Sequence, residues 1–188
     1  CQWSAIDGMF GVSYKTVYHR FNAWSKHRLF EHAFYELASE YRKKHDNLPL
    51  LVDTSHVKNV FGRDVLGPNH ADRGRKSTKV SLLSDSQARP LTIMFHQGNR
   101  NDCLTLTHLL TETTRRYGNI DSHKYLYADK GYDSKTRRSS CAVRGLEPRI
   151  PHRGMTTKWG GVRIRVEHVF GRMDKFRRII LRYDSSIR

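Results

Sequence analysis

Hydrophobic positions in the first part of the chain recur at helical spacing. After Ser13, apolar side chains stand at positions 14, 17, 21 and 24, the i, i+3/i+4 pattern of one helix face. Ser13 itself suits the N-cap of this helix. The stretch "RLFEHAFYELASEYRKKH" repeats the pattern and ends in basic residues, which favour a helix C-terminus. A further short helix is predicted in "WSAIDGMFGV", followed by a turn at Gly11.

These elements predict a small all-helical region over residues 1–46 with the outline of a helix-turn-helix, a DNA-binding motif. A helical hairpin packed on the main domain is the alternative interpretation. The pattern alone does not decide between the two.

After Asn47 the pattern becomes that of strands. "LPLLVDTSHV" is a continuous apolar run that enters Asp53, and "TKVSLLSD" and "RPLTIMFHQG" predict two further strands joined by a short turn. Residues 59–77 are rich in Gly, Asn and Arg, which predicts a loop.

Helices and strands alternate over the rest of the chain. We predict a helix at 102–116, a strand at 124–128, a short helix at 132–143 and a short strand at 148–151. Apolar positions 166, 169, 170, 173, 176 and 180 predict a last helix within "VRIRVEHVFGRMDKFRRII". The order of elements predicts a mixed α/β domain over residues 47–188.

The charge changes this picture, because it indicates a partner. Lys and Arg total 34 against 18 Asp and Glu, a net charge of +16, and residues 134–188 carry fifteen Lys/Arg against four Asp/Glu. A polyanion is therefore expected, nucleic acid first and an anionic membrane surface second. We expect no signal peptide and no membrane span, since no apolar run approaches the ~20 residues that a bilayer requires.

The cysteines and the chain ends carry further expectations. Three cysteines, odd in number and far apart, indicate a reducing, intracellular setting such as the cytoplasm or nucleoid. The chain begins at Cys1 and ends at Arg188 inside a basic, apolar-periodic pattern, so we expect a fragment trimmed at both ends.

Three carboxylates are the candidate chemistry. Asp53 and Asp129 each close an apolar strand, and Glu167 lies on the last helix. A carboxylate at such a position is partly desolvated and needs an arginine, a helix N-terminus or a cation to neutralise it. Oxygen ligands without a His/Cys cluster favour Mg²⁺ or Mn²⁺ over zinc. A turn or cap role for each aspartate stays open.

Three blocks of the sequence resemble a known family. "LVDTSHVK", "ADKGYDS" and "RIRVEHVFGRMDKFRRIILRYD" resemble the catalytic blocks of DDE transposases of bacterial insertion sequences, in the IS-four/IS-five superfamily. That family's Y-(2)-R-(3)-E-(6)-K signature is met at Arg163 and Glu167. Gly160 stands at the Tyr position and Asp174 at the Lys position, with Lys175 one residue later.

The resemblance implies an RNase H-like mixed sheet flanked by helices. It implies that Asp53, Asp129 and Glu167 are the catalytic and metal-binding residues and hold two Mg²⁺ ions, with Mn²⁺ as a substitute. The implied activity is cleavage of DNA at transposon ends and transfer of the freed strand to target DNA. The implied assembly is a homodimer or higher assembly on DNA.

Several basic or aromatic residues are candidate DNA contacts: Lys15, Arg20, Lys130, Trp159, Arg163, Arg165 and Lys175. Solvated helix faces, an Arg163–Glu167 ion pair and a hydrophobic anchor at Trp159 are the structural alternatives. His56, three residues after Asp53, could orient water or could simply be packed. Two other functions remain for the whole chain, a catalytically inactive DNA-binding remnant of a transposase and an RNase H-like nuclease. A basic binding module without metal chemistry would leave the three carboxylate blocks unexplained.

Overall fold

The computed structural model describes residues 3–152, 154, 160–176, 180–184 and 186. The chain divides into two compact units, Cys1–Leu37 with Arg188, and Ala38–Ile187. Helix α2 (Leu29–Lys44) contributes to both units, and near its end Arg42 donates a hydrogen bond of 2.9 Å to the Tyr117 carbonyl within the larger one. The predicted division of roles between residues 1–46 and 47–188 stays a prediction.

The smaller unit is built from helices. A 3₁₀ helix, η1 (Trp3–Ile6), precedes α1 (Tyr14–Lys26). Ser13 caps α1 as predicted, because its Oγ accepts a hydrogen bond of 3.3 Å from the Lys15 amide. The ring of Trp3 lies 5.1 Å from that of Phe21, which in turn lies 5.5 Å from Phe30 of α2. Aromatic contacts between helices therefore hold this unit together.

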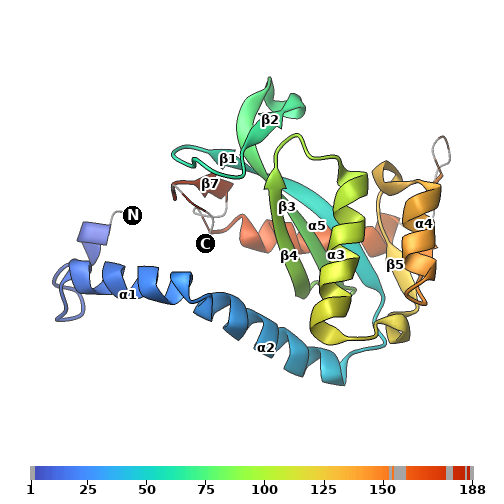
Figure 1. Cartoon of the computed structure of the whole chain (residues 1–188), viewed down its shortest axis with the longest axis horizontal. Helices are drawn as coiled ribbons and strands as arrows, with labels where there is room; N and C mark the ends of the chain where they lie inside the picture. The colour runs from blue at the N-terminus through green and yellow to red at the C-terminus, as the bar shows by residue number, and fades with distance from the viewer. Residues whose placement is uncertain (1–2, 153, 155–159, 177–179, 185, 187–188) are drawn as a thin grey trace. The chain divides into compact units, whose positions relative to one another are not determined.

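The larger unit combines one sheet with three further helices (Figure 1). In chain order its remaining elements are β1 (Leu50–Asn59), β2 (Gly67–Asn69), η2 (His70–Asp72), β3 (Arg75–Asp85), β4 (Pro90–Gln97), α3 (Asp102–Tyr117), η3 (Asp121–His123), β5 (Tyr125–Tyr127), η4 (Lys130–Tyr132), α4 (Lys135–Ala142), β6 (Glu147–Arg149), α5 (Gly160–Met173) and β7 (Leu181–Arg182). No helix among the described residues is long and apolar enough to cross a membrane.

The sheet is mixed, with β1 at its centre. β1 and β4 both pair antiparallel with β3, whereas β5 pairs parallel with β1 and β6 pairs parallel with β5. Ser77 of β3 pairs with Lys58 of β1 on one side and with Gly67 of β2 on the other, so β2 continues the edge that β4 forms. The strand order β4-β3-β1-β5-β6 flanked by helices is an RNase H-like fold, as predicted.

Two hydrophobic clusters cover the two faces of the sheet. Leu50, Val52 and Leu83 face α3 and α4, where they pack with residues such as Leu109 and Cys141. Leu51 and Leu82 face the opposite side, together with the α5 residues that pack there, Val162, Val166, Val169, Phe170 and Met173. Figure 1 shows α3 and α4 in front of the sheet and α5 behind it. Successive residues of β1 therefore alternate between the two helical layers.

The structure corrects two predictions of secondary structure. Residues 59–77 are not all loop, because β2, η2 and the start of β3 form a hairpin there. The segments of this hairpin lack alternating apolar and polar residues, so only their pairing with β3 identifies them as strands. The last helix ends at Met173 rather than at Ile180, and Phe176, predicted on its packed face, is 65% exposed. The chain turns at Asp174 and then forms β7.

β7 returns the chain to the sheet after α5. It pairs parallel with the end of β1, with Lys58 opposite Leu181 and Asn59 opposite Arg182. The Arg182 side chain is 6% exposed and forms an ion pair with Asp64, in the segment between β1 and β2. It also donates to the Thr78 hydroxyl of β3 at 3.0 Å. One buried guanidinium thus ties three separate segments together.

The packing of α3 gives a test of the core. Leu109 is fully buried, whereas Leu104 of the same helix is 40% exposed. Leu109→Ala is expected to lower the free energy of unfolding by about 2–5 kcal/mol, because it removes buried methyl groups and leaves a cavity. Leu104→Ala is expected to cost less than about 1 kcal/mol. Urea denaturation followed by circular dichroism measures both, and equal losses would contradict the assignment of α3 faces.

Candidate active site

Two of the predicted carboxylates lie in or just after neighbouring strands of the sheet. Asp53 is the fourth residue of β1, so the prediction that it closes a strand is wrong, because β1 continues to Asn59 through its pairing with β3. Asp129 follows the end of β5 by two residues.

The parallel pairing sets Leu50 opposite Leu126 and Leu51 opposite Tyr127. Continued by two residues beyond the end of β5, this register would set Asp53 beside Asp129.

Both aspartates lie on the face of the sheet that α5 crosses. Leu51 and Tyr127 pack in the cluster on the α5 side, and side chains alternate along extended backbone. Asp53 follows Leu51 by two residues. Asp129 follows Tyr127 by two residues and is itself extended, with φ −73° and ψ 162°. The two carboxylates therefore point toward the same helical layer.

Local hydrogen bonds fix the backbone at both positions. Asp53 is half-buried, and its Oδ1 accepts a hydrogen bond of 2.8 Å from the Thr54 amide. Asp129 is also half-buried and precedes η4, where its carbonyl accepts a hydrogen bond of 2.9 Å from the Tyr132 amide. Asp133, four residues after Asp129, forms an ion pair with Arg138 at 2.8 Å.

Glu167 lies on α5 beside the packed face of that helix. Its neighbour Val166 is buried against the sheet, while Glu167 is exposed. Within the described part of the chain, no three His, Cys, Asp or Glu side chains are gathered closely enough to hold a metal ion. The assignment of Asp53, Asp129 and Glu167 to one metal site therefore stays a prediction.

The donor chemistry of this face fits a hard divalent cation. Two carboxylates on neighbouring strands supply oxygen ligands of the kind that Mg²⁺ takes. α5, which carries the third carboxylate, crosses the same face. The fit extends to the type of ligand and to the placement of Asp53 and Asp129.

The sequence did not predict the ion pair between Lys79 and Asp102, which lies beside Thr54 of β1. Lys79 Nζ of β3 lies 2.5 Å from Asp102 Oδ1 at the start of α3, and the Lys79 side chain is 8% exposed. The same ammonium donates to the Arg100 carbonyl at 2.6 Å. A lysine inside the apolar strand "TKVSLLSD" was the available signal, because a buried ammonium requires a partner.

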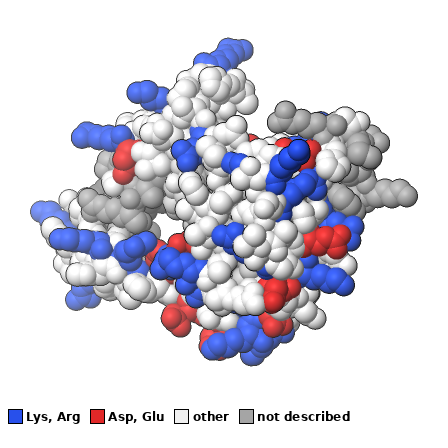
Figure 2. All heavy atoms as spheres, turned by 45° about the vertical axis from the view of Figure 1, so that its right-hand side comes forward, with Lys and Arg blue, Asp and Glu red and all other residues white. Residues whose placement is uncertain are grey.

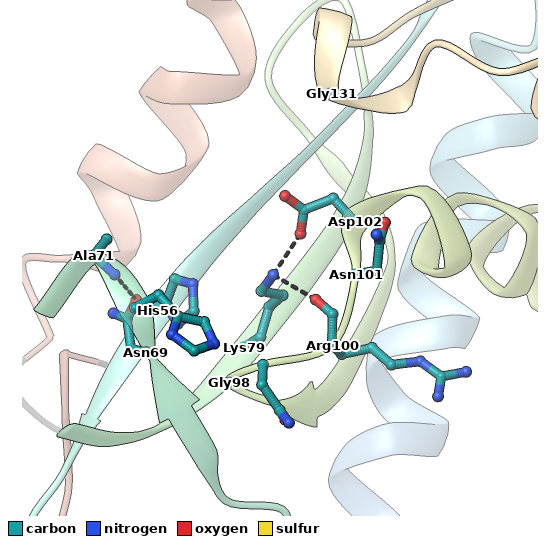
Figure 3. A pocket seen from close by; sticks show the side chains of 11 residues that line it. His56, Asn69, Ala71, Lys79, Gly98, Arg100, Asn101, Asp102 and Gly131 are labelled. Atoms are coloured by element: carbon teal, nitrogen blue, oxygen red, sulfur yellow. Dashed lines mark hydrogen bonds and ion pairs between the residues drawn. The ribbon is translucent and has the colours of Figure 1, made fainter. Parts of the chain in front are cut away.

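These groups line a cavity of about 390 Å³ (Figure 3). His56 lies on one side of Lys79 and Asp102 on the other, with Gly131 above them in the view. His56 Nδ1 is 2.9 Å from the Ser77 hydroxyl, so this histidine is held by the hairpin strand β3. The cavity lies on the α3 side of β1, because His56 and Thr54 alternate with Asp53.

The predicted DNA contacts lie on several separate elements. Lys15 and Arg20 are exposed on α1, Lys130 is exposed on η4, and Lys175 is exposed in the turn after α5. Arg165 is exposed on α5 and donates to the Ser86 carbonyl at 3.0 Å. Trp159 lies outside the described residues, and Arg163 belongs to α5, with its side chain also outside the description.

Basic side chains are spread over the surface rather than confined to one spot. Figure 2 shows Lys and Arg across the visible face, with acidic side chains interspersed among them. With a net charge of +16, such a surface attracts a polyanion at many points.

The mixed sheet with helices on both faces is the fold of RNase H-like domains. Residues 44–188 match the family model described as "Transposase DDE domain", which covers most of the chain. The chain belongs to this family, and the resemblance seen in the sequence is confirmed.

Individual relatives give the same class. A Burkholderia cepacia protein whose name describes it as a transposase for insertion sequence element IS402 is 31% identical over 130 residues. The match takes in 66% of this chain and 62% of that protein, so the chain spans less than two thirds of its relative.

Two solved structures are also similar. The catalytic domain of Mos1 mariner transposase has a TM-score of 0.44 at 11% identity, over 76% of this chain and 67% of that one. A simian T-cell lymphotropic virus intasome bound to PP2A regulatory subunit B56 gamma has a TM-score of 0.46 at 11% identity, over 69% and 39%.

The histidines around Lys79 give a pH test. Burial, with the nearby Lys79 charge, lowers the pKa values of His56 and His96, and His108 and Arg100 lower that of His96 further. Below about pH 6.5 the unfolded chain therefore binds more protons than the folded one, and stability falls as the pH drops.

Urea denaturation at about pH 7.5 and about pH 5.5 measures this loss of stability. His96→Gln is expected to show a smaller loss than the unmodified protein. The exposed His70, changed to Gln, serves as control. An undiminished loss in His96→Gln would contradict this assignment.

Proposed function

We propose that this chain is the catalytic part of a DNA transposase. It binds transposon-end DNA, cleaves the phosphodiester at the element's end with water, and joins the freed 3′-hydroxyl to target DNA. The observation that carries the proposal is the parallel pairing of β1 with β5, whose register, continued beyond Tyr127, would bring Asp129 beside Asp53. Membership of the transposase DDE family supports the same activity.

Asp53, Asp129 and Glu167 are the residues proposed to hold two divalent ions, Mg²⁺ or Mn²⁺. Bound ions of this kind activate the attacking oxygen and stabilise the leaving oxygen of a phosphodiester. Asp53 would supply its carboxylate from within β1, Asp129 from the segment after β5, and Glu167 from α5. The attacking groups are water and a DNA hydroxyl, so the mechanism needs no Ser or Cys nucleophile.

The basic surface is proposed to hold the DNA. Neutralised phosphates release counterions, which makes such binding strong at low salt and weak at high salt. Side chains from both units are the proposed contacts: Lys15, Arg20, Lys130, Trp159, Arg163, Arg165 and Lys175. Assembly as a homodimer or higher assembly on paired DNA ends, inside the cell, completes the proposal.

One observation favours a second candidate function, a DNA-binding remnant without catalysis. The three carboxylates are not gathered into one group in the described residues, and Asp174 occupies the position of the signature lysine. In that case DNA binding persists while cleavage is absent from the unmodified chain. Cleavage of RNA–DNA hybrids in preference to transposon ends would instead indicate an RNase H-like nuclease.

Substitution of the carboxylates tests the catalytic assignment. Asp53→Asn, Asp129→Asn and Glu167→Gln are each expected to reduce Mg²⁺-dependent cleavage of transposon-end DNA by at least about 100-fold, because each removes charge that stabilises the transition state. The dissociation constant for the same DNA is expected to change by less than about threefold, since counterion release by basic residues dominates binding. Glu147→Gln, at an exposed carboxylate on β6, is the control. Retained cleavage in Asp129→Asn would refute this site.

The basic face of α1 gives a separate test of DNA binding. Lys15→Gln combined with Arg20→Gln is expected to reduce the slope of log K against log salt by about 1.8, or about 0.9 for each lost phosphate contact. Fluorescence anisotropy with labelled duplex DNA over a range of salt concentrations measures this slope. The exposed Lys44→Gln on α2 is a single-charge comparison. An unchanged slope in the double variant would remove α1 from the interface.

A further inference from the structure

We infer that the N-terminus of α3 holds the part of β1 that carries Asp53 and the segment after β5 that carries Asp129 in their mutual position. Thr54, Lys79, Asp102 and Cys103 are thereby positioning residues for the paired carboxylates. The inference rests on the proposed function, because it concerns how those carboxylates are held.

The first connection joins α3 to the middle of β1, at Thr54. Asp102 Oδ1 accepts a hydrogen bond of 3.3 Å from the Thr54 hydroxyl and is 2.5 Å from Lys79 Nζ. Removing one member would leave a buried charge or a lost hydrogen bond, so the three side chains hold each other in place. Figure 3 shows the Lys79 ammonium directed at both Asp102 and the Arg100 carbonyl.

Thr54 transmits this restraint to Asp53. The two residues are adjacent in β1 and point to opposite faces, and the Thr54 amide donates to Asp53 Oδ1 at 2.8 Å. The side chain of Thr54 is thus fixed on the α3 side while its backbone orients the carboxylate on the α5 side. A shift of Thr54 would turn the peptide that holds Asp53.

The second connection joins α3 to the segment after β5. The Cys103 thiol donates to the Gly131 carbonyl at 2.9 Å, and Arg137 Nε donates to the Cys103 carbonyl at 2.7 Å. Gly131 lies within η4, whose first turn begins at Asp129. The residue next to Asp102 therefore restrains the turn that carries the second carboxylate.

Tyr132 fills the space beneath these two connections. Its side chain is 2% exposed, within the core cluster between the sheet and α3. Burial raises the pKa of its hydroxyl, and the nearby charges of Asp102 and Asp53 raise it further. Tyr132 therefore packs in the core directly after Gly131, one of the residues that line the cavity.

The functional consequence is one of distance. Two carboxylates that share metal ions must keep a separation set to within about 0.5 Å, and residues that orient metal ligands typically affect metal affinity by about 10–100-fold. α3 is a continuous helix. Its first residue, Asp102, contacts Thr54 of β1, and its second, Cys103, contacts Gly131 of η4, so the helix sets that separation from the opposite face of the sheet.

Paired substitutions test this role. Thr54→Val and Cys103→Val remove the hydroxyl or thiol donor, whereas Thr54→Ser and Cys103→Ser keep a donor. Both Val variants are expected to weaken binding of Mn²⁺ alone, measured by electron paramagnetic resonance, by about 10-fold. Single-turnover cleavage of transposon-end DNA is expected to slow by a similar factor with an unchanged dissociation constant for DNA. Both Ser variants are expected to stay within about threefold of the unmodified protein.

A destabilised comparison variant separates positioning from general stability. Cys141→Ala removes a buried side chain of the same core cluster and is expected to lower the melting temperature without weakening Mn²⁺ binding. The inference is overturned if the Val variants bind Mn²⁺ and cleave like the unmodified protein, or if Cys141→Ala weakens Mn²⁺ binding as much as they do. The Cys103 pair decides the question should Thr54→Val fail to fold.

Failure of the proposed function has a different signature. In that case the unmodified protein itself neither binds Mn²⁺ at Asp53, judged against Asp53→Asn, nor cleaves DNA. An active unmodified protein with unaffected Val variants would overturn only the positioning role of α3.

Discussion

The parallel pairing of β1 with β5 is the constraint on which the rest of the larger unit depends. Because side chains alternate along a strand, this one register decides which residues face α3 and which face α5. A slip of one residue would send Leu51 to the wrong cluster and turn Asp53 away from Asp129. The apolar residues that precede both aspartates thus fix chemistry and packing together, since either error would also expose core side chains.

Electrostatics place a second demand on the same region. The chain carries a net charge of +16, yet it also buries the ammonium of Lys79 within the sheet. That charge is tolerated because Asp102 and a backbone carbonyl compensate it locally. The surface cations remain available to solvent and DNA, while the buried one is committed to the architecture around the site.

Much of this arrangement was predictable from local patterns, and the remainder depends on distant contacts. Asp53 and Asp129 stood out because each ends an apolar run, and Ser13 because capping is a local interaction. The hairpin within residues 59–77 was missed because its segments become strands only through pairing with β3. The contact between Thr54 and Asp102 joins residues 48 positions apart, which no periodicity reveals. The exposure of Glu167 likewise depends on where α5 packs.

After α5, the chain returns to the sheet through β7, which pairs with the end of β1. Arg182 of β7 ties the segment after α5 to Asp64 and to Thr78. Removing the chain from Leu181 onward would take away the strand that pairs with the end of β1 and the guanidinium that pairs with Asp64. The helix that bears Glu167 would then depend on its own packing against the sheet, through residues such as Val166 and Val169.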